Sequence, residues 1–438
     1  MSDIPHLDGQ KLIHLPPACL KPHPGNPRVH SNEQVRKIAA SIKRFGFRNP
    51  VLVDDDQNVV AGHGRLLAAA ELGLETVPTL LLSGMTEAER RAYLVADNRL
   101  AECATWDDER LAAELAAIAT LDGALDLALT GFDGGALERL LEQVATGAAG
   151  VDETAQVDTG APLVSRPGDT WVLGRHRLAV GDALDQATFE RLMQGELAQM
   201  VITDPPYNVP IDGHVCGLGK VKHAEFAMAS GEMNKDEFEA FLSTSLGNLA
   251  KFSREGSIHF VFMDWRHLEE ILAAGRLAYT ELKNLIVWNK DNGGMGAFYR
   301  SKHELIFAFK KGTDKHINNF ELGQHGRYRT NVWDYAGISS VGNDRDEQLA
   351  MHPTVKPVAM IADAIRDCSK HGGIVLDAFG GSGTTLVAAE QTGRKARLVE
   401  IDPGYADVTV RRWQKMTGEQ AVLEGKGVPF DELEGHRD

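Results

Sequence analysis

The stretch Asp204-Pro205-Pro206-Tyr207 joins an acid, two prolines and an aromatic ring to the end of the apolar run at 201–203. A core strand that ends in this way places its carboxylate at the carboxyl edge of a sheet, where ligands of parallel sheets bind. The prolines fix two φ angles and remove two N–H donors, which leaves the carboxylate and a backbone carbonyl as rigid acceptors. Their natural ligand is an –NH₂ group, and the tyrosine ring is a flat surface for a base. We therefore predict that these four motif residues hold the exocyclic amine of a nucleobase and act as the catalytic residues.

A second motif is the glycine-rich turn within 374–385, which reads IVLDAFGGSGTT. Its apolar start predicts a strand, and Gly381 and Gly383 allow a tight turn that approaches a ligand closely. A helix that begins near Thr384 directs its free N–H groups and its positive dipole end at that ligand. The next predicted strand ends in Glu400, an acid that can accept ribose hydroxyl hydrogens. Together these features predict a site for a nucleoside-containing cofactor.

Other common sites fit the sequence less well. A dinucleotide fingerprint would have its third glycine at position 386, where the chain has Leu386, so an NAD oxidoreductase is the weakest enzyme class considered. No GKS or GKT phosphate loop is found, which argues against an ATPase. The four cysteines form no CxxC pair, so neither a zinc site nor a disulfide framework is predicted, and we predict no metal.

The two motifs DPPY and DAFGGSGTT resemble those of the S-adenosylmethionine-dependent DNA amino-methyltransferases, which modify adenine N6 or cytosine N4. DPPY precedes the cofactor loop, an order similar to that of the circularly permuted β group. Two more segments fit the resemblance, AVGDALD at 179–185 and MHPTVKP at 351–357. The resemblance covers about 166–415 and implies S-adenosyl-L-methionine as cofactor. The contacts that it implies are Asp182, Thr354, Lys356, Asp377, Phe379, Gly381, Gly383, Thr384 and Glu400.

The chemistry of this family agrees with the residue types. The lone pair of an adenine amine is delocalised into the ring, and acceptance of both N–H hydrogens by Asp204 and the Pro205 carbonyl favours a pyramidal, nucleophilic nitrogen. The carboxylate also stabilises the positive charge that develops on nitrogen, and the base must leave the duplex to reach it. Aspartate rather than serine before PPY favours adenine N6, with cytosine N4 as the alternative. Carbon-5 methylation is disfavoured because no cysteine follows a proline.

Charge is unevenly distributed along a chain whose formal net charge is −16. Residues 283–333 carry nine Lys or Arg against four acids, residues 1–50 carry eight against three, and residues 104–165 carry twelve acids against two arginines. Two basic stretches separated by an acidic one favour a polyanionic partner. We predict double-stranded DNA, with a target-recognition region at about 290–345. The predicted DNA contacts there are Lys290, Arg300 and Lys302.

Two hypotheses from other functional classes remain open. One is a DNA-binding, ParB-like protein whose methylase half is inactive, and the other is an RNA or protein-amide methyltransferase, which would share the PPY chemistry. Intact Asp204, Tyr207 and Glu400 argue against the first, and the motif order with the basic insert argues against the second. The glycine-rich loop at 208–234 follows the catalytic motif, and we interpret it as a lid over the base or cofactor.

The N-terminal segment resembles the ParB N-terminal fold that sulfiredoxin shares. GHGR at 62–65 is similar to the GxxR box of that family, and ADNRLAE at 96–102 is similar to a second box. The resemblance implies a phosphate or nucleotide site at Gly62, Gly64, Arg65 and Asn98. His63 and Gly64 depart from the usual charged form of the box, which disfavours hydrolysis, and a docking or DNA-positioning domain without catalysis is the main alternative. The segment WDDERLAAELAAIA is helical but acidic, and we assign no helix-turn-helix to it.

The length of the chain and changes in its residue pattern indicate several parts. We predict a ParB-like α+β domain at 1–145, a linker at 146–165 and a methyltransferase domain at 166–417, followed by a loose tail at 418–438. The alternation of strands and helices after 166 predicts an α/β, Rossmann-like fold. No apolar run is long enough for a bilayer and no secretory signal is visible, so a cytoplasmic protein that is not membrane-bound is expected. A homodimer is left open.

Overall fold

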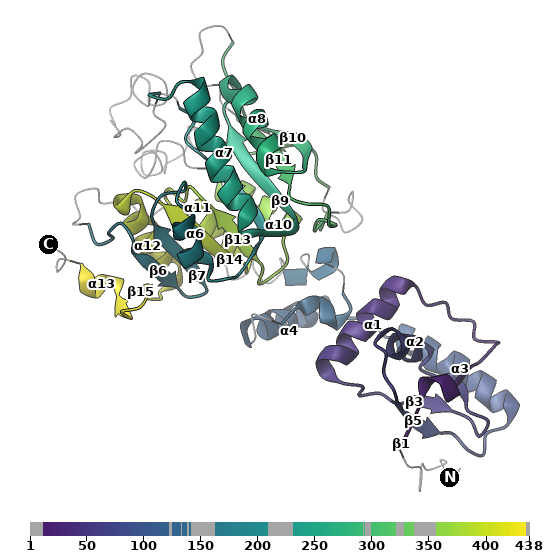
Figure 1. Cartoon of the computed structure of the whole chain (residues 1–438). Coiled ribbons are helices and arrows are strands. Elements are labelled where there is room, and N and C mark those ends of the chain that lie inside the picture. The colour runs from purple at the N-terminus through teal and green to yellow at the C-terminus, as the bar shows by residue number, and fades with distance from the viewer. Residues whose placement is uncertain are drawn as a thin grey trace. The chain divides into compact units, whose positions relative to one another are not determined.

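The computed structural model describes residues 12–121, 125–132, 134–137, 140–141, 163–208, 231–291, 293, 299–320, 328–336 and 356–434 (Figure 1). The chain divides into two units, Met1–Leu140 and Leu141–Asp438. Among the helices of the described ranges, none combines the length and apolar character needed to cross a membrane.

The N-terminal unit is built on a small mixed sheet with the strand order β1-β5-β3-β4-β2. Helix α2 follows β4 directly through Gly62, which adopts a left-handed conformation with a φ of +99°. The elements of the unit are β1 (Leu12–Leu15), β2 (Lys21–Pro22), α1 (Asn32–Phe45), β3 (Val51–Val53), β4 (Asn58–Ala61), α2 (His63–Glu71), β5 (Val77–Leu81), α3 (Glu87–Glu102) and α4 (Asp108–Leu121), with short 3₁₀ turns at Pro17–Cys19 and Leu127–Thr130.

Local sequence signals explain where α1 begins and ends. The Ser31 side chain accepts a hydrogen bond from the Gln34 N–H at 3.1 Å, which caps the first turn. Gly46 ends the helix with a φ of +83°. Between them, Val35 and Ala39 face Ala68 of α2 in a small apolar cluster. Phe45, the last residue of the helix, lies outside this cluster and is 43% exposed.

The second unit contains an eleven-stranded mixed sheet, in the order β12-β10-β11-β9-β8-β13-β14-β7-β6-β15-β16. Its elements are β6 (Thr170–Leu173), β7 (His176–Val180), α6 (Gln186–Met193), β8 (Ala198–Thr203), α7 (Lys235–Lys251), β9 (Ser253–Met263), a 3₁₀ turn (Trp265–His267), α8 (Leu268–Ala278), β10 (Glu281–Asn289), β11 (His303–Lys310), β12 (Val332–Asp334), α10 (Val358–Cys368), β13 (Ile374–Asp377), α11 (Thr384–Gln391), β14 (Lys395–Glu400), α12 (Pro403–Thr417), β15 (Val422–Leu423), β16 (Val428–Pro429) and α13 (Phe430–Leu433).

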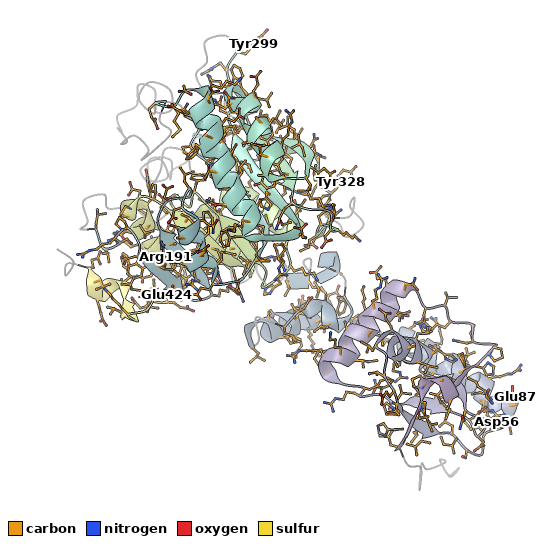
Figure 2. The ribbon with its side chains drawn as sticks, in the orientation of Figure 1. Asp56, Glu87, Arg191, Tyr299, Tyr328 and Glu424 are labelled. Atoms are coloured by element: carbon orange, nitrogen blue, oxygen red, sulfur yellow. The ribbon has the colours of Figure 1, made fainter. Side chains whose placement is uncertain are left out.

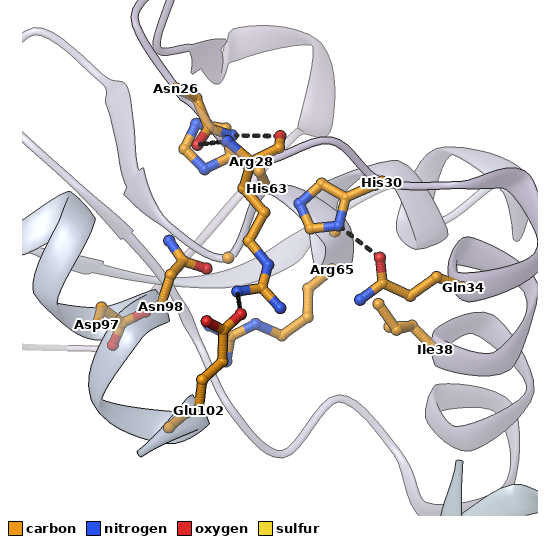
Figure 3. A pocket seen from close by; sticks show the side chains of 13 residues that line it. Asn26, Arg28, His30, Gln34, Ile38, His63, Arg65, Asp97, Asn98 and Glu102 are labelled. Atoms are coloured by element: carbon orange, nitrogen blue, oxygen red, sulfur yellow. Dashed lines mark hydrogen bonds and ion pairs between the residues drawn. The ribbon is translucent and has the colours of Figure 1, made fainter. Parts of the chain in front are cut away.

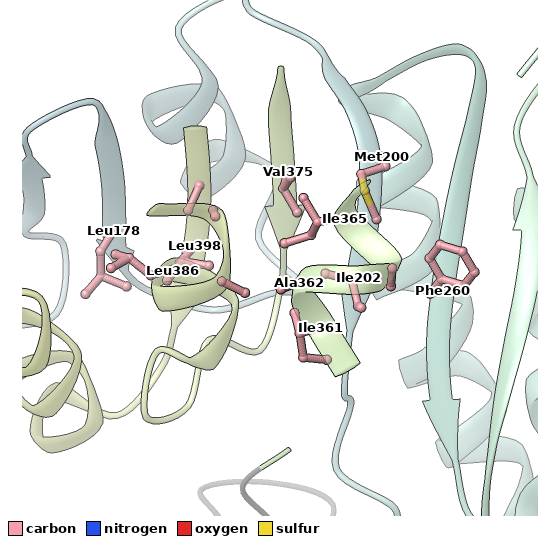
Figure 4. Close-up of a cluster of buried hydrophobic side chains, with 14 of the residues drawn as sticks. Leu178, Met200, Ile202, Phe260, Ile361, Ala362, Ile365, Val375, Leu386 and Leu398 are labelled. Carbon is pink, nitrogen blue, oxygen red and sulfur yellow. The ribbon is translucent and has the colours of Figure 1, made fainter. Parts of the chain in front are cut away.

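Helices cover both faces of this sheet, so its central strands are apolar on both sides. Side chains of β8 alternate between the two layers: Met200 and Ile202 pack in a cluster with α10, α11 and α12 (Figure 4), whereas Val201 packs in a cluster with α6, α7 and α8. The predicted α/β class of this unit and the smaller mixed unit before it are confirmed.

Strands β9, β8, β13, β14 and β7 run parallel to one another. The chain leaves β8 through α7 to reach β9 on one side, and it leaves β13 through α11 to reach β14 on the other side. The strand order therefore reverses between β8 and β13. In open parallel sheets, this reversal opens a crevice at the carboxyl edge in which ligands bind.

Two boundary predictions were wrong. The tail after 417 is not loose, because β15 pairs with β6 and extends the central sheet. Phe430 is fully buried against Trp171, with ring centroids 5.0 Å apart, so apolar burial fixes this segment. At the other end, Val164 and Ser165 fall in our predicted linker but are buried, and their N–H groups donate to Asp407. Most of that predicted linker lies outside the described residues.

Because Phe430 fills the core beneath β6, Phe430→Ala should leave a cavity and lower the free energy of unfolding by about 3–5 kcal/mol. Glu432→Ala, at an exposed position of the same short helix, should change it by less than about 0.5 kcal/mol. Urea denaturation of the full chain, followed by tryptophan fluorescence, measures both. Equal stabilities of the two variants would mean that the tail does not belong to the core.

Candidate active site

Four acids follow the carboxyl ends of four adjacent parallel strands. Asp204 comes directly after β8, Asp377 is the last residue of β13, Glu400 is the last residue of β14, and Asp182 lies two residues beyond β7. Since parallel strands share one carboxyl edge, the sheet brings all four acids to the same edge, with Asp204 on one side of the reversal point and the other three on the other side. Sequence motifs that lie far apart in the chain thus converge on one region, as the sequence predicted for Asp204 and the glycine loop.

The aspartate and tyrosine of the DPPY stretch interact with each other and with Lys356. The Tyr207 hydroxyl donates to Asp204 Oδ1 at 2.7 Å, and Lys356 Nζ lies 2.5 Å from Asp204 Oδ2. Lys356 Nζ also lies 5.6 Å from the centre of the Tyr207 ring. Only 6% of the Lys356 side chain and 23% of the Asp204 side chain are exposed, so this ion pair is largely shielded from water.

Glu304, on β11, completes the cluster, and the sequence analysis missed it. Its carboxylate accepts from Lys356 at 3.3 Å and lies 3.2 Å from the Tyr207 hydroxyl, and it forms a short ion pair with Lys290. The available signal was a charged residue within the otherwise apolar strand HELIFAF. The name acid–lysine cluster is used below for these five residues, Asp204, Tyr207, Lys356, Glu304 and Lys290.

Asn208 is a second residue that the sequence analysis missed. It follows Tyr207 and adopts a φ of +51°, which is unusual for a residue other than glycine. Its side-chain oxygen accepts from the Gly231 and Met233 N–H groups at 3.0 and 3.2 Å, and its amide donates to the Met233 carbonyl at 2.7 Å. These bonds tie the DPPY segment to the chain that leads into α7. Residues 209–230 of the predicted lid at 208–234 lie outside the described residues.

Burial and charge act together on the pKa values of the acid–lysine cluster. Burial raises the pKa of Asp204, and the charge of Glu304 raises it further, although Lys356 opposes both effects. Burial also favours the neutral form of Glu304, but the two lysines outweigh it and lower its pKa to about 2. The pKa of Lys356 is raised because its two carboxylate partners outweigh its burial. The cluster therefore contains a firmly ionised Glu304 and an Asp204 that takes up a proton more readily.

The glycine loop connects β13 to α11. Gly381 has a φ of +51° and Gly383 a φ of +84°, and a Cβ on Gly383 would lie 2.8 Å from a methyl group of Thr409. Any other residue at position 383 would therefore be strained and would clash. The N–H group of Gly381 donates to Glu400 at 2.6 Å, which closes the loop against the end of β14. Thr384 begins α11 and is buried.

The buried acids at the ends of β13 and β14 are held by protein donors. Asp377 accepts from the hydroxyls of Thr203 and Thr385 at 2.8 and 2.7 Å, and Glu400 accepts from the Asp402 N–H at 2.9 Å. Burial nevertheless raises the pKa of each acid to about 7. Two carboxyls that titrate near neutral pH at one sheet edge are typical of a functional site.

The remaining predicted cofactor contacts vary in their placement. Asp182 is half-buried and accepts from the Leu184 N–H at 2.8 Å. Phe379 is half-buried beside Phe241, with ring centroids 5.9 Å apart. Thr354 lies outside the described residues. Lys356 is placed against Asp204, so the structure brings it to the DPPY motif.

The three predicted DNA contacts differ in their surroundings. Lys290 is paired with Glu304 inside the acid–lysine cluster, whereas Arg300 and Lys302 are exposed before β11. Tyr299 and Tyr328 are each 81% exposed and project from the surface in Figure 2. Part of the predicted target-recognition region is sheet, because β11 and β12 are paired strands with buried residues.

The N-terminal unit contains a separate pocket of about 390 Å³ at the start of α2 (Figure 3). Its walls include the predicted residues Gly62, Gly64, Arg65 and Asn98, together with Arg28, His30, His63 and Glu102. Arg28 donates to Glu102 at 2.5 Å. The side-chain N–H of Asn98 donates to the Leu94 carbonyl, and the side-chain oxygen of Asn98 takes no part in that bond. Burial lowers the pKa of His63, and His30 and His23 lower it further. Neither in this pocket nor elsewhere in the described ranges do three His, Cys, Asp or Glu side chains gather as metal ligands.

Three known protein families match the chain. Residues 198–411 match the DNA methylase family, residues 1–98 match the ParB N-terminal domain, and residues 109–167 match the ParB-methyltransferase HTH domain. The third match corrects our sequence analysis, which assigned no helix-turn-helix there. Helix α4 lies in that segment, and its acidic first turn concealed the resemblance.

Individual proteins show the same division. The ParB-like nuclease domain-containing protein YnaK of Escherichia coli is 43% identical over 81 residues, which are 18% of this chain and 93% of that protein. The DNA adenine methyltransferase YhdJ of Escherichia coli is 25% identical over 257 residues, which are 53% of this chain and 80% of that protein. The crystal structure of the M1.HpyAVI–SAM complex is 20% identical, with a TM-score of 0.40 over 54% of this chain and 97% of that chain.

The raised pKa of Asp377 predicts a pH-dependent stability. The unfolded chain releases the proton of this acid near pH 4, whereas the folded protein keeps it until about pH 7. The free energy of unfolding therefore falls as the pH rises from about 4 to about 7. Asp377→Asn removes this ionisation, so the unfolding free energy of the variant should improve relative to wild type by roughly 2–4 kcal/mol over that range. Denaturant titrations at several pH values measure the difference. Asp236→Asn, at an exposed position of α7, is the matched control, and a difference that does not change with pH for Asp377→Asn would refute the assignment.

Proposed function

We propose that this chain, which belongs to the N6/N4 DNA methylases, methylates adenine N6 in double-stranded DNA. It carries a ParB N-terminal domain and a ParB-methyltransferase HTH domain before the methylase domain. It is thus a DNA amino-methyltransferase, and the choice of adenine over cytosine is the finer part of the proposal. The observation that carries it is the half-buried Asp204 carboxylate, held beside the glycine loop by the contact between Thr203 and Asp377.

The residues around the loop fit S-adenosylmethionine as the methyl donor. The left-handed turn at Gly383 leaves no room for a side chain, as expected where backbone N–H groups line a ligand. Glu400 and Asp182 end neighbouring strands and offer carboxylates to a ribose and an adenine amine, and Phe379 offers a ring at the same edge. When bound, the cofactor supplies an electrophilic methyl group to this edge.

Asp204 performs the central step. Its carboxylate and the Pro205 carbonyl accept the two N–H hydrogens of the target amine, which directs the nitrogen lone pair at the methyl group. The positive charge that develops on nitrogen is stabilised by the same carboxylate, in surroundings that exclude most water. Tyr207 stacks on the extruded base. Positioning and electrostatics thus account for most of the proposed catalysis.

Two observations support adenine. The acceptor before PPY is an aspartate, which is the residue that the sequence analysis associated with adenine N6. YhdJ, which is similar over 53% of this chain, is a DNA adenine methyltransferase. Exposed Tyr299, Arg300, Lys302 and Tyr328 are proposed to contact the duplex, because basic and aromatic side chains together suit phosphates and unstacked bases.

Asp204→Ala should abolish methyl transfer by removing the acceptor of the target amine, with a loss of about 10³-fold or more. Binding of S-adenosylmethionine, measured by calorimetry, should be largely retained. The assay follows tritiated methyl transfer from the cofactor to bacterial genomic DNA that lacks methylation, and the nucleosides are separated after digestion. Asp236→Asn, at an exposed site on α7, is the matched control and should keep full activity.

Three results would change the assignment. Label in N4-methylcytosine would keep the mechanism and correct the base. Transfer to RNA or protein but not to DNA would replace the substrate class. Full activity of Asp204→Ala would contradict the catalytic role of the DPPY motif.

For the N-terminal unit, we also propose a nucleotide site in the pocket at the start of α2. The pocket combines two arginines, a helix N-terminus and a volume of about 390 Å³, which is within the range of small-ligand sites. Burial lowers the pKa of Arg65, although Asp97 opposes this, so a phosphate group would stabilise a partly desolvated guanidinium. We propose binding without hydrolysis.

Titration of the full chain with CTP and with ATP, each with Mg²⁺, tests this site by calorimetry. Arg65→Ala should weaken the binding of either nucleotide by about 10-fold or more, because a charge-assisted contact to phosphate is lost. Arg91→Ala, an exposed arginine of α3 on no wall of the pocket, should leave it unchanged. If neither nucleotide binds wild-type protein, the domain serves DNA positioning alone.

A further inference from the structure

Glu304 shares its hydrogen-bond donors with Asp204. Lys356 Nζ lies 2.5 Å from Asp204 Oδ2 and 3.3 Å from Glu304 Oε2. The Tyr207 hydroxyl lies 2.7 Å from Asp204 Oδ1 and 3.2 Å from the same oxygen of Glu304. Two carboxylates from different strands, β8 and β11, are thus connected through one ammonium and one hydroxyl group.

The two contacts of the Tyr207 hydroxyl cannot both be hydrogen bonds at the same time. A phenol hydroxyl carries a single hydrogen, so Tyr207 donates to only one carboxylate at a time. The shorter distance assigns that hydrogen to Asp204. Oδ1 of Asp204 is therefore occupied by Tyr207, and Oδ2 is occupied by Lys356. Each carboxylate oxygen has a second lone pair, so Asp204 can still accept a target amine, but an amine that takes the direction of the Tyr207 hydrogen bond displaces that hydroxyl.

On the basis of the proposed function, we infer that Glu304 is a positioning residue that accepts the Tyr207 hydroxyl when the target amine replaces it on Asp204. The hydrogen moves from one carboxylate to the other by rotation of the hydroxyl group and a small movement of the ring. No buried hydroxyl is left unpaired, which would otherwise oppose base binding. Lys356 meanwhile remains between the two acids.

Charge balance gives Glu304 a second effect on the same step. The acid–lysine cluster contains two carboxylates and two ammonium groups, and its tyrosine is neutral, so its net charge is zero when all four groups are ionised. Without the charge of Glu304 the cluster becomes positive. A positive surplus beside Asp204 opposes the positive charge that develops on the amine nitrogen.

Lys290 holds Glu304 in this position. Its ammonium pairs with the carboxylate and lies 4.5 Å from the centre of the Trp288 ring. Only 25% of its side chain is exposed, and 17% of that of Glu304. The lysine that the sequence analysis assigned to DNA is thus better placed to fix Glu304 than to contact phosphates.

The test compares Glu304→Gln with Glu304→Asp in the full chain. Glutamine keeps the shape and an acceptor oxygen but removes the charge, and aspartate keeps the charge on a shorter stem. For Glu304→Gln, kcat with unmethylated genomic DNA should fall about 10- to 100-fold, with the Kd for S-adenosylmethionine unchanged. Glu304→Asp should recover part of this loss. Glu281→Gln, at an exposed acid of β10, is the matched control.

The pH profile of kcat supplies the readout that a structural role would not move. Asp204 is faced by Lys356, by Glu304 on β11, by Tyr207 and by Asp377 on β13. Activity requires the Asp204 carboxylate, so it is lost as the pH falls through the pKa of this group. Removal of the Glu304 charge lowers that pKa. The acid limb of Glu304→Gln should therefore lie at lower pH than that of wild type or Glu281→Gln.

Two outcomes would overturn the inference. One is a Glu304→Gln variant that binds the cofactor and has the kcat and acid limb of wild type. The other is a loss of activity without a shifted acid limb, with weaker cofactor binding or a lower melting temperature, which would identify a merely structural residue. Failure of the proposed function looks different, because wild-type protein itself would then transfer no methyl group to DNA.

Discussion

The hydrogen bond from the Thr203 hydroxyl to Asp377, at 2.8 Å, is the contact on which the arrangement of the site depends. It joins the last residue of β8 to the last residue of β13, the two strands between which the sheet order reverses. The DPPY motif begins at the next residue on one side, and the glycine loop begins at the next residue on the other. A buried side-chain bond therefore sets the position of the predicted base site against that of the predicted cofactor site.

The same edge of the sheet concentrates acids that burial disfavours. Isolated carboxylates in such surroundings would be strongly destabilising, so each one has donors. Asp377 and Glu400 rely on hydroxyl and backbone N–H donors, and their pKa values rise to about 7. Asp204 and Glu304 rely on lysines, and their pKa values shift in opposite directions, upward for Asp204 and downward for Glu304. The acids at the predicted cofactor site, Asp377 and Glu400, therefore have neutral donors. The acids at the predicted base site, Asp204 and Glu304, have a charged donor in Lys356.

Much of this site could be predicted from the sequence because its parts are local. DPPY and the glycine loop are contiguous motifs, and the rule for parallel strands brings their ends together. Glu304 could not be found in this way, because its partners Asp204 and Lys356 come from segments that only the sheet order brings together. The ion pair of Lys290 with Glu304 was missed for the same reason, since a basic residue in a basic stretch gives no sign of a partner on another strand. The ordered tail was missed because short strands such as β15 are specified by pairing with β6 and not by local periodicity.

A rigid acceptor and movable donors are both needed at a site that must admit a base. The prolines and the contact between Thr203 and Asp377 hold the backbone of Asp204 in place, and two strands support it. The groups that occupy its oxygens, a hydroxyl and an ammonium, are the ones that can rotate. Because Glu304 lies within 3.3 Å of both, these donors can change partner without being exposed to water or left unpaired. The arrangement keeps Asp204 paired before the base arrives and leaves it able to accept the amine afterwards.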